Sequence, residues 1–147
     1  MRVKDCMSKN IVYVTKENTV QEIADLMSKH HIGSVPVCDN NRHVLGIVTD
    51  RDIILRTIAS KKDIGSARAE EVMTKDVIKT SEDTDASWVS EIMSKNQIRR
   101  VPVVENEKLV GIVSVGDLAK NNDFPNTEVA SCMSKICNSG CDCKHSE

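Results

Sequence analysis

The 147-residue chain contains one internal repeat, and this duplication constrains its fold more than any other feature. Met7-Ser8-Lys9 returns 66 residues later as Met73-Thr74-Lys75, and Val35-Pro36-Val37 returns at the same offset as Val101-Pro102-Val103. The offset then falls to 65 across a polar stretch, which indicates a one-residue difference in a turn. Two copies of so long a period describe a duplicated domain rather than a solenoid. The sequence therefore predicts two related versions of any functional site.

Each copy of the repeat predicts the order strand, helix, strand, strand, helix. In the first copy, Thr19 and Glu22 form a capping box before apolar residues at helical spacing, and Gly33 is expected to end that helix. Asp50 is expected to cap the last helix of this copy, which should reach residue 59. The expected elements are strands at 11–14, 35–38 and 44–49 with a turn at 39–41, then a strand at 77–78, a helix at 85–96, strands at 101–105 and 109–114, and a helix at 116–120.

These elements predict an α+β chain with two similar halves. The expected boundaries are 1–60 for the first repeat, 61–68 for the linker, 69–121 for the second repeat and 122–147 for a Cys-rich tail that can be flexible. In the tail, four apolar residues indicate no more than a short amphipathic turn or two: Val129, Cys132, Met133 and Ile136.

Composition and missing motifs exclude several function classes. A net charge of −2 argues against sequence-independent binding to nucleic acid, which needs a clustered basic face. No apolar run approaches the ~20 residues of a membrane span, and the N-terminus lacks the apolar core of a signal peptide. We therefore expect a soluble, cytoplasmic chain without a nucleic-acid or membrane partner. The nucleophile elbow, Walker loop and His-Glu-x-x-His motif are missing from the sequence, so no enzyme is expected.

The most informative motif is the predicted strand-to-helix corner of each repeat. Gly46–Ile53 and Gly111–Leu118 share the pattern Gly, two apolar residues, Thr or Ser, two variable residues, Asp, apolar residue. The hydroxyl and the carboxylate can face one cavity, and a carboxylate that accepts two hydroxyl donors suits a cis-diol such as ribose. The adjacent helix N-terminus favours an anion. In the alternative interpretation, the hydroxyl residue and Asp50 cap the helix and the later carboxylates complement its dipole.

Across residues 1 to about 121, the two repeats resemble a tandem pair of CBS domains, also called a Bateman module. The resemblance is carried by the Met-Ser/Thr-Lys opening, the Val-Pro-Val strand and the Gly-x-x-Ser/Thr-x-x-Asp corner, each present twice. It implies two pseudo-symmetric β-α-β-β-α units packed through their sheets, and often a homodimer. It also implies a non-catalytic regulatory module that senses an adenosine-containing ligand, AMP, ADP or ATP above all, in clefts between the repeats. Dimer geometry would then pass the signal to an unidentified protein partner.

The resemblance further implies which residues bind the ligand. Asp52 and Asp117 would hold the ribose hydroxyls, beside Thr49 and Ser114. Adenine in the Asp52 cleft would contact Thr80, Ile98, Arg99, Arg100 and Pro102, and adenine in the Asp117 cleft would contact Val14, Thr15, Ile32, Gly33, Ser34 and Pro36.

The two clefts are expected to differ in charge. Arg99 and Arg100 offer guanidinium groups where the other repeat has Gly33 and Ser34, and guanidinium binds phosphate in a bidentate manner. The Asp52 cleft should therefore prefer a phosphorylated ligand, whereas the Asp117 cleft should take a less charged adenosyl group or stay empty. The alternative is that the two arginines form a solvated strand edge.

Two features lie outside this pattern. Trp88 replaces Glu22 of the first repeat and lies off the apolar stripe of its helix, so it is either a dimer contact or an exposed residue without function. The tail contains a cluster of soft ligands that suits Zn²⁺ or Cu(I): Cys132, Cys137, Cys141, Cys143 and His145. An alternative function is therefore a ligand-free interaction adaptor with a metal-binding or redox-sensing tail, and an inert tail also remains open.

Overall fold

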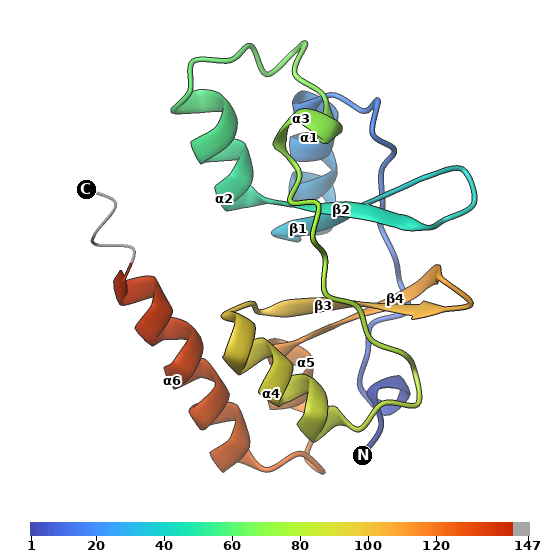
Figure 1. Ribbon diagram of the computed structural model, residues 1–147, viewed down its shortest axis with the longest axis vertical. Coiled ribbons are helices and arrows are strands. Elements are labelled where there is room, and N and C mark those ends of the chain that lie inside the picture. The colour runs from blue at the N-terminus through green and yellow to red at the C-terminus, as the bar shows by residue number, and fades with distance from the viewer. Residues whose placement is uncertain (143–147) are drawn as a thin grey trace. The chain divides into compact units, whose positions relative to one another are not determined.

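The computed structural model describes the backbone of residues 1–142 and the side chains of residues 1–138 (Figure 1). The fold is α+β, as expected, and the chain divides into two units. Unit 1 contains Met1–Ile11, Ile78–Glu105 and the chain from Val110 onward; unit 2 contains Val12–Val77 and Asn106–Leu109. Each unit is built on a hairpin and the helices that pack on it.

Unit 2 carries the first repeat. Its elements are α1 (Val20–His30), β1 (Ser34–Cys38), β2 (Val44–Thr49), α2 (Asp50–Ile53) with a π-helical turn η2 (Ile54–Ile58), and α3 (Ala69–Val72). The predicted hairpin is confirmed: β1 and β2 are antiparallel, with Ser34 opposite Thr49 and Pro36 opposite Ile47. The short helix α3 and the π-helical turn were not predicted from the sequence.

Helix α1 begins as predicted but ends earlier. Thr19 Oγ1 accepts the backbone N–H of Glu22, and the Glu22 carboxylate accepts the N–H of Thr19, so the capping box is confirmed. His31, with φ 54°, forms the left-handed C-cap, and its N–H bonds to Met27 O. The expectation that Gly33 ends the helix is therefore wrong, because a histidine adopts the left-handed conformation two residues before it.

The first strand expected in each repeat is reduced to a single bridge. Val14 pairs in parallel with Val37, and its N–H bonds to Pro36 O at 3.0 Å. Thr80 pairs with Val103 in the same way in unit 1. The strands predicted at 11–14 and 77–78 are therefore wrong in extent and, in the second repeat, in position. The apolar residues of these short runs are held by side-chain packing and not by the hydrogen-bond ladder of a full strand.

Unit 1 carries the second repeat. Its elements are the 3-10 turn η1 (Val3–Asp5), α4 (Ala86–Asn96), β3 (Arg100–Glu105), β4 (Lys108–Ser114), α5 (Val115–Lys120) and α6 (Asn126–Asp142). Asn106 and Glu107, which join β3 to β4, have φ 51° and 66°, the conformation of a tight two-residue turn. The turn of the first hairpin is longer, so the predicted change of offset is confirmed to lie in a turn.

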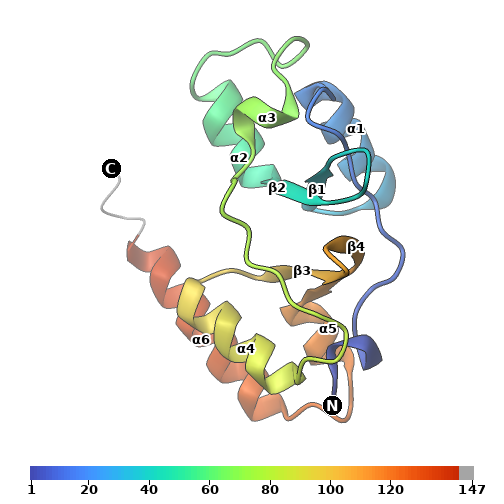
Figure 2. The same cartoon turned by 45° about the vertical axis from the view of Figure 1, so that its right-hand side comes forward.

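Helix α6 corrects the expectation for the tail. It extends over 17 residues and packs against α4 and α5, as Figures 1 and 2 show. Cys132 and Ile136 are only 1% and 5% exposed. The apolar spacing was visible in the sequence, but the length was underestimated because burial of one face stabilises a helix that carries few local signals.

The opening segments of the two repeats are exchanged. Ser8, from the opening of the first repeat, pairs with Ile112 in β4: Ser8 N–H bonds to Ile112 O at 2.8 Å and Ile112 N–H to Ser8 O at 3.0 Å. Thr74, from the opening of the second repeat, pairs with Ile47 in β2 in the same way, at 2.9 and 3.0 Å. Each repeat is therefore completed by a segment that belongs to the other repeat in sequence.

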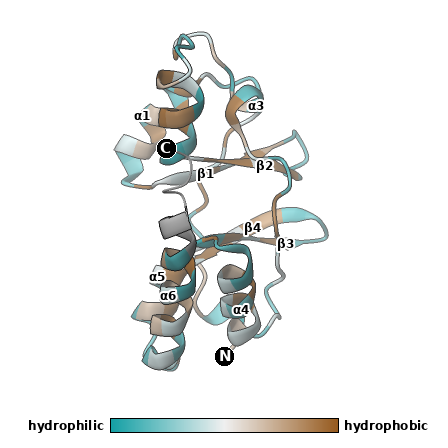
Figure 3. Cartoon of the chain, turned by 60° about the vertical axis from the view of Figure 1, so that its left-hand side comes forward, coloured by the Kyte–Doolittle hydropathy of each residue, from teal (hydrophilic) through white to brown (hydrophobic). Residues whose placement is uncertain are grey.

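Each unit has its own apolar core. Figure 3 shows hydrophobic residues along β2 and both hydrophobic and hydrophilic residues on α1, as expected for amphipathic elements. The buried residues of unit 2 are Val14, Val20, Ile23, Met27, Val35, Val37, Val48, Ile53, Ala67, Ala69 and Val72. A corresponding cluster fills unit 1 and includes Val3, Met7, Phe124 and residues of α6. Within the described residues, no helix combines the length and apolarity needed to cross a membrane.

Candidate functional site

The corner of the first repeat lies where β2 ends and α2 begins. The backbone N–H of Asp52 donates to Thr49 Oγ1 at 3.1 Å, and the N–H of Thr49 donates to Asp52 Oδ2 at 3.0 Å. Thr49, rather than Asp50, is therefore the N-cap residue. The reciprocal bonds fix the hydroxyl and the carboxylate on one side of the turn.

The corner of the second repeat has the same geometry. Asp117 N–H donates to Ser114 Oγ at 3.1 Å, and Ser114 N–H donates to Asp117 Oδ2 at 2.9 Å. Both carboxylates thus use Oδ2 for the capping box. Oδ1 accepts no hydrogen bond from residues 1–138 in either corner. A carboxylate has acceptor capacity for several donors, so helix capping and ligand binding are compatible in the same residue.

A side chain that the sequence analysis missed distinguishes the two corners. Arg56 lies on η2 with its Nε 3.7 Å from Asp52 Oδ1, and its Nη1 donates to the carbonyl oxygens of Val72 and Met73 at 3.0 and 3.1 Å. The residue at the matching position of the second repeat is Asn121. The i,i+4 spacing from Asp52, together with this difference between the repeats, is the signal that could have identified Arg56.

In unit 2, the backbone places Gly33 and Ser34 beside the Thr49–Asp52 corner. Asp50 N–H bonds to Gly33 O at 2.9 Å, and Ser34 and Pro36 lie buried on β1 opposite Thr49 and Ile47. Of the remaining predicted residues of this unit, Val14 is bridged to β1 and the Thr15 hydroxyl contacts Asn18 Oδ1. Ile32 follows the C-cap of α1.

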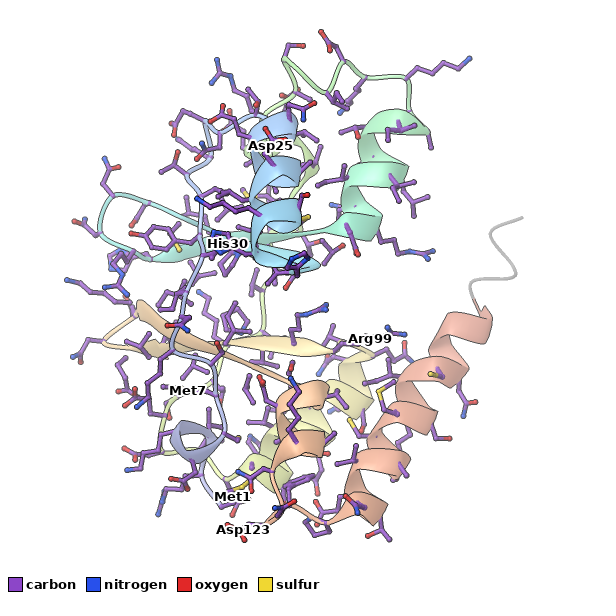
Figure 4. All side chains as sticks on the ribbon, turned by 180° about the vertical axis from the view of Figure 1, so that it is seen from behind. Met1, Met7, Asp25, His30, Arg99 and Asp123 are labelled. Carbon is purple, nitrogen blue, oxygen red and sulfur yellow. The ribbon has the colours of Figure 1, made fainter. Side chains whose placement is uncertain are left out.

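In unit 1, the backbone of Arg99 contacts the start of α5, directly after Ser114. Val115 N–H bonds to Arg99 O at 3.0 Å. Arg99 itself is exposed on the loop between α4 and β3, where Figure 4 labels it. Of the other predicted residues, Thr80 donates its backbone N–H to the carbonyl oxygen of Pro102. Ile98 is half-buried, and Arg100 is the first residue of β3.

Each repeat therefore brings part of its predicted set to its own corner: Gly33 and Ser34 in unit 2, and Arg99 in unit 1. The assignment of the two adenine-contacting sets to the corner of the other repeat stays a prediction.

A cysteine also lies near the second corner: burial, together with the negative charges of Asp117 and Asp5, raises the pKa of the Cys6 thiol to about 11. Cys6 is therefore a protonated thiol at neutral pH.

Of the five predicted metal ligands in the tail, Cys132 and Cys137 have described side chains. Cys132 is buried in unit 1 and its thiol donates to Ser90 O at 3.5 Å, whereas Cys137 is exposed. No group of three or more metal-ligating side chains occurs among the described residues. The side chain of Cys141 and the whole of Cys143 and His145 lie outside the described residues.

The chain is similar to a family model and to characterised proteins along most of its length. The model for the CBS domain matches residues 3–57 and 69–122. The CBS domain-containing protein YhcV of Bacillus subtilis is 38% identical over 91% of this chain and 94% of that protein.

Two solved structures share both the sequence pattern and the fold. The crystal structure of Hypoxic Response Protein I with two coordinated zinc ions is 30% identical, with a TM-score of 0.77 over 82% of this chain and 98% of that one. The CBS domain pair of protein MJ0100, in complex with 5'-methylthioadenosine and S-adenosyl-L-methionine, is 34% identical, with a TM-score of 0.75 over 82% of this chain and 94% of that one. This chain belongs to the CBS-domain family and consists of a pair of CBS domains.

Proposed function

We propose that this CBS pair is a non-catalytic regulatory module that binds an adenosine-containing ligand, AMP, ADP or ATP above all, through Asp52 and Asp117. The observation that carries the proposal is the repeated corner. In both repeats the capping box fixes an Asp carboxylate and leaves its Oδ1 to accept hydroxyl donors. A carboxylate held in this way is suited to the two hydroxyls of a ribose.

Two further observations support an adenosyl ligand. The MJ0100 domain pair, which is similar over 82% of this chain, was solved with two such molecules. Asp52 is also accessible but well enclosed, with 15% of its side chain exposed. The roles assigned to the adenine-contacting sets and to Arg99 and Arg100 in phosphate preference remain part of the proposal.

A ligand panel tests the proposed function. The reduced protein is heated in the presence of AMP, ADP, ATP, S-adenosylmethionine, adenosine and, as the matched negative control, guanosine. A ligand that binds the folded state and not the unfolded state raises the melting temperature, and the shift grows with the logarithm of the ligand concentration above its Kd. We expect adenine nucleotides to raise it and guanosine to leave it unchanged. If no adenosine compound raises the melting temperature at millimolar concentration, the proposal is wrong.

We also propose that the module assembles as a homodimer. Ile54, Leu55 and Ile58 of η2 form an exposed apolar strip, with Ile58 61% exposed. Trp88, expected from the sequence to lie off the buried stripe, is 58% exposed on α4. Large apolar side chains on a surface are typical of interfaces. Sedimentation of Ile58→Asp and Trp88→Ala distinguishes the two surfaces: the variant that becomes monomeric identifies the contact, and an unchanged dimer in both contradicts this location.

The alternative function, an adaptor with a metal-binding or redox-sensing tail, is favoured by two observations. Cys137 is an exposed thiol, and a similar protein was solved with two zinc ions. Metal analysis of the purified protein, with Cys137→Ser as the matched variant, tests it. Zinc or copper bound in stoichiometric amount and lost in the variant would support the adaptor, and metal-free protein would contradict it.

A further inference from the structure

The two corners share their capping geometry but differ in one charged neighbour. Arg56 approaches Asp52, whereas Asn121 occupies the matching position beyond Asp117. No ion pair to Asp117 occurs within the described part of the chain. The two repeats therefore hold the Asp52 and Asp117 carboxylates in the same geometry, but among the described residues only Asp52 has a side-chain cation within ion-pair distance.

Arg56 is held mainly by the backbone rather than by the carboxylate. Its Nη1 donates to both the Val72 and the Met73 carbonyl oxygen, at 3.0 and 3.1 Å. These two bonds fix the guanidinium before any ligand arrives. Val72 is buried, and Met73 immediately precedes Thr74, which pairs with Ile47 of β2. The cation is therefore preorganised beside the corner by the exchanged opening segment.

The distance between the two charged groups leaves the carboxylate available. Arg56 Nε lies 3.7 Å from Asp52 Oδ1, which is within range of electrostatic attraction but longer than a hydrogen bond. Oδ1 can therefore still accept a ligand hydroxyl. At the same time, the adjacent guanidinium offsets the negative charge of the carboxylate.

This charge balance has a consequence for a ligand that carries phosphate. The phosphate of AMP is attached to the same ribose whose hydroxyls Asp52 would hold, so two negative charges share one site and repel each other. The guanidinium reduces that repulsion, and 46% of its side chain is exposed and accessible to a phosphate oxygen. At the Asp117 corner Asn121 takes the place of Arg56, and no side chain among residues 1–138 forms an ion pair with Asp117.

We infer that Arg56 is a positioning and specificity residue that lets the Asp52 corner accept a phosphorylated adenosine ligand. This inference rests on the proposed function, because it assigns a ligand charge to the Asp52 carboxylate of that proposal. It differs from the assignment of Arg99 and Arg100, because Arg56 lies in the same unit as Asp52 and its contacts are defined.

Binding of AMP and adenosine tests the inference, since the two ligands differ only in the phosphate. Titrations are made in an Asp117→Ala background, so that the Asp52 corner alone is measured. Arg56→Gln keeps N–H donors for the Val72 and Met73 carbonyls but removes the charge, and Arg56→Lys keeps the charge. Melting temperatures show that each variant is folded.

We expect Arg56→Gln to weaken AMP binding about fivefold, the upper range for a half-exposed ion pair, with adenosine affinity changed less than about twofold. Arg56→Lys should retain the preference for AMP, and added salt should reduce that preference in the Lys variant but not in the Gln variant. A purely structural role would lower both affinities by the same factor.

An AMP-to-adenosine ratio that is unchanged in Arg56→Gln would overturn the inference. If Asp52→Ala still abolishes binding in that case, the proposed function stands and only the role of Arg56 is wrong. If Asp52→Ala binds both ligands as the parent does, the proposed function fails and this inference fails with it.

Discussion

Asp52 Oδ1 lies 3.7 Å from Arg56 Nε, whereas Asp117, its counterpart, has Asn121 in the position of that arginine. The other carboxylate oxygen, Oδ2, accepts a backbone N–H in both repeats. The two repeats therefore share the Oδ2 contact that caps the helix, and they differ in the side chain beside Oδ1, the oxygen left for a ligand. Stability and ligand binding can be separated experimentally on this basis.

Asp52→Ala is expected to lower the free energy of unfolding by about 1 kcal/mol, because the capping box at the start of α2 is lost. Glu22→Ala is the matched control, since Glu22 completes the same type of capping box at α1 and is not a proposed ligand contact. Urea unfolding should show losses of similar size in both variants. A much larger loss in Asp52→Ala would mean that the carboxylate has a structural role beyond the cap.

Gly46→Ala is expected to destabilise the protein by about 1 to 3 kcal/mol, the usual cost of overpacking. An added Cβ would lie 2.6 Å from Met73 Sδ and 2.8 Å from Thr74 O, so the exchanged opening segment would have to move. Gly65→Ala is the matched control, because its Cβ would meet only the Asp63 side chain, at 3.4 Å. Equal stability of the two variants would contradict the close packing of the exchanged segment.

Ile136→Ala is expected to cost about 2 to 5 kcal/mol, because it removes a buried side chain from the contact of α6 with the rest of unit 1. Lys135→Ala changes the neighbouring exposed position and should have little effect. Thermal and urea unfolding measure both. If Ile136→Ala is as stable as the parent, α6 does not contribute to the core.

Alkylation of the thiols should follow their burial and pKa. Among Cys6, Cys132 and Cys137, iodoacetamide at pH 8 is expected to modify Cys137 fastest, Cys6 slowly because its pKa is raised to about 11, and Cys132 slowest because it is buried. Peptide mass spectrometry over time gives the order. Rapid modification of Cys132 in the folded protein would contradict the packing of α6.

The contact between Lys4 and Asp83 predicts a small pH dependence. The hydrogen bond from Lys4, 3.0 Å long, lowers the pKa of Asp83 below 3.8, and the same contact raises the pKa of Lys4 above 10.5. The stabilisation is therefore complete between these values. It is lost as pH falls through the lowered pKa of Asp83 or rises through the raised pKa of Lys4.

Melting curves of the parent and Asp83→Asn measure this dependence. The two melting temperatures should differ at pH 7 and converge as the pH falls through the lowered pKa of Asp83, where Asp83 of the parent becomes protonated. A difference that stays constant through this acid range would show that the aspartate acts through something other than its charge.

Sequence reasoning predicted best those elements that local signals define. Thr19 and Glu22 located the start of α1, and the hairpin strands followed from short β-branched runs bounded by turn residues. The corner carboxylates were found because they are repeated with their hydroxyl partners. The alternative that these residues cap a helix is also correct, with Thr49 rather than Asp50 as the cap.

What the sequence did not predict depends on contacts between distant residues. The exchange of Ser8 and Thr74 between repeats carries no local signal beyond Gly46 and Gly111, whose lack of a side chain makes room for it. Helix α6 depends on burial against α4 and α5 more than on its own propensity. The role of Arg56 was not predicted because the two backbone carbonyls that fix its side chain lie on another segment.

Calorimetric titration of AMP into the parent, Asp52→Ala and Glu22→Ala tests the central claim most directly. The account predicts that the parent and Glu22→Ala bind AMP with the same affinity, and that Asp52→Ala loses at least tenfold, because a charge-assisted hydrogen bond contributes about 1.5 to 3 kcal/mol. Equal AMP affinity in all three folded proteins would contradict the claim that the corner carboxylate holds the ligand.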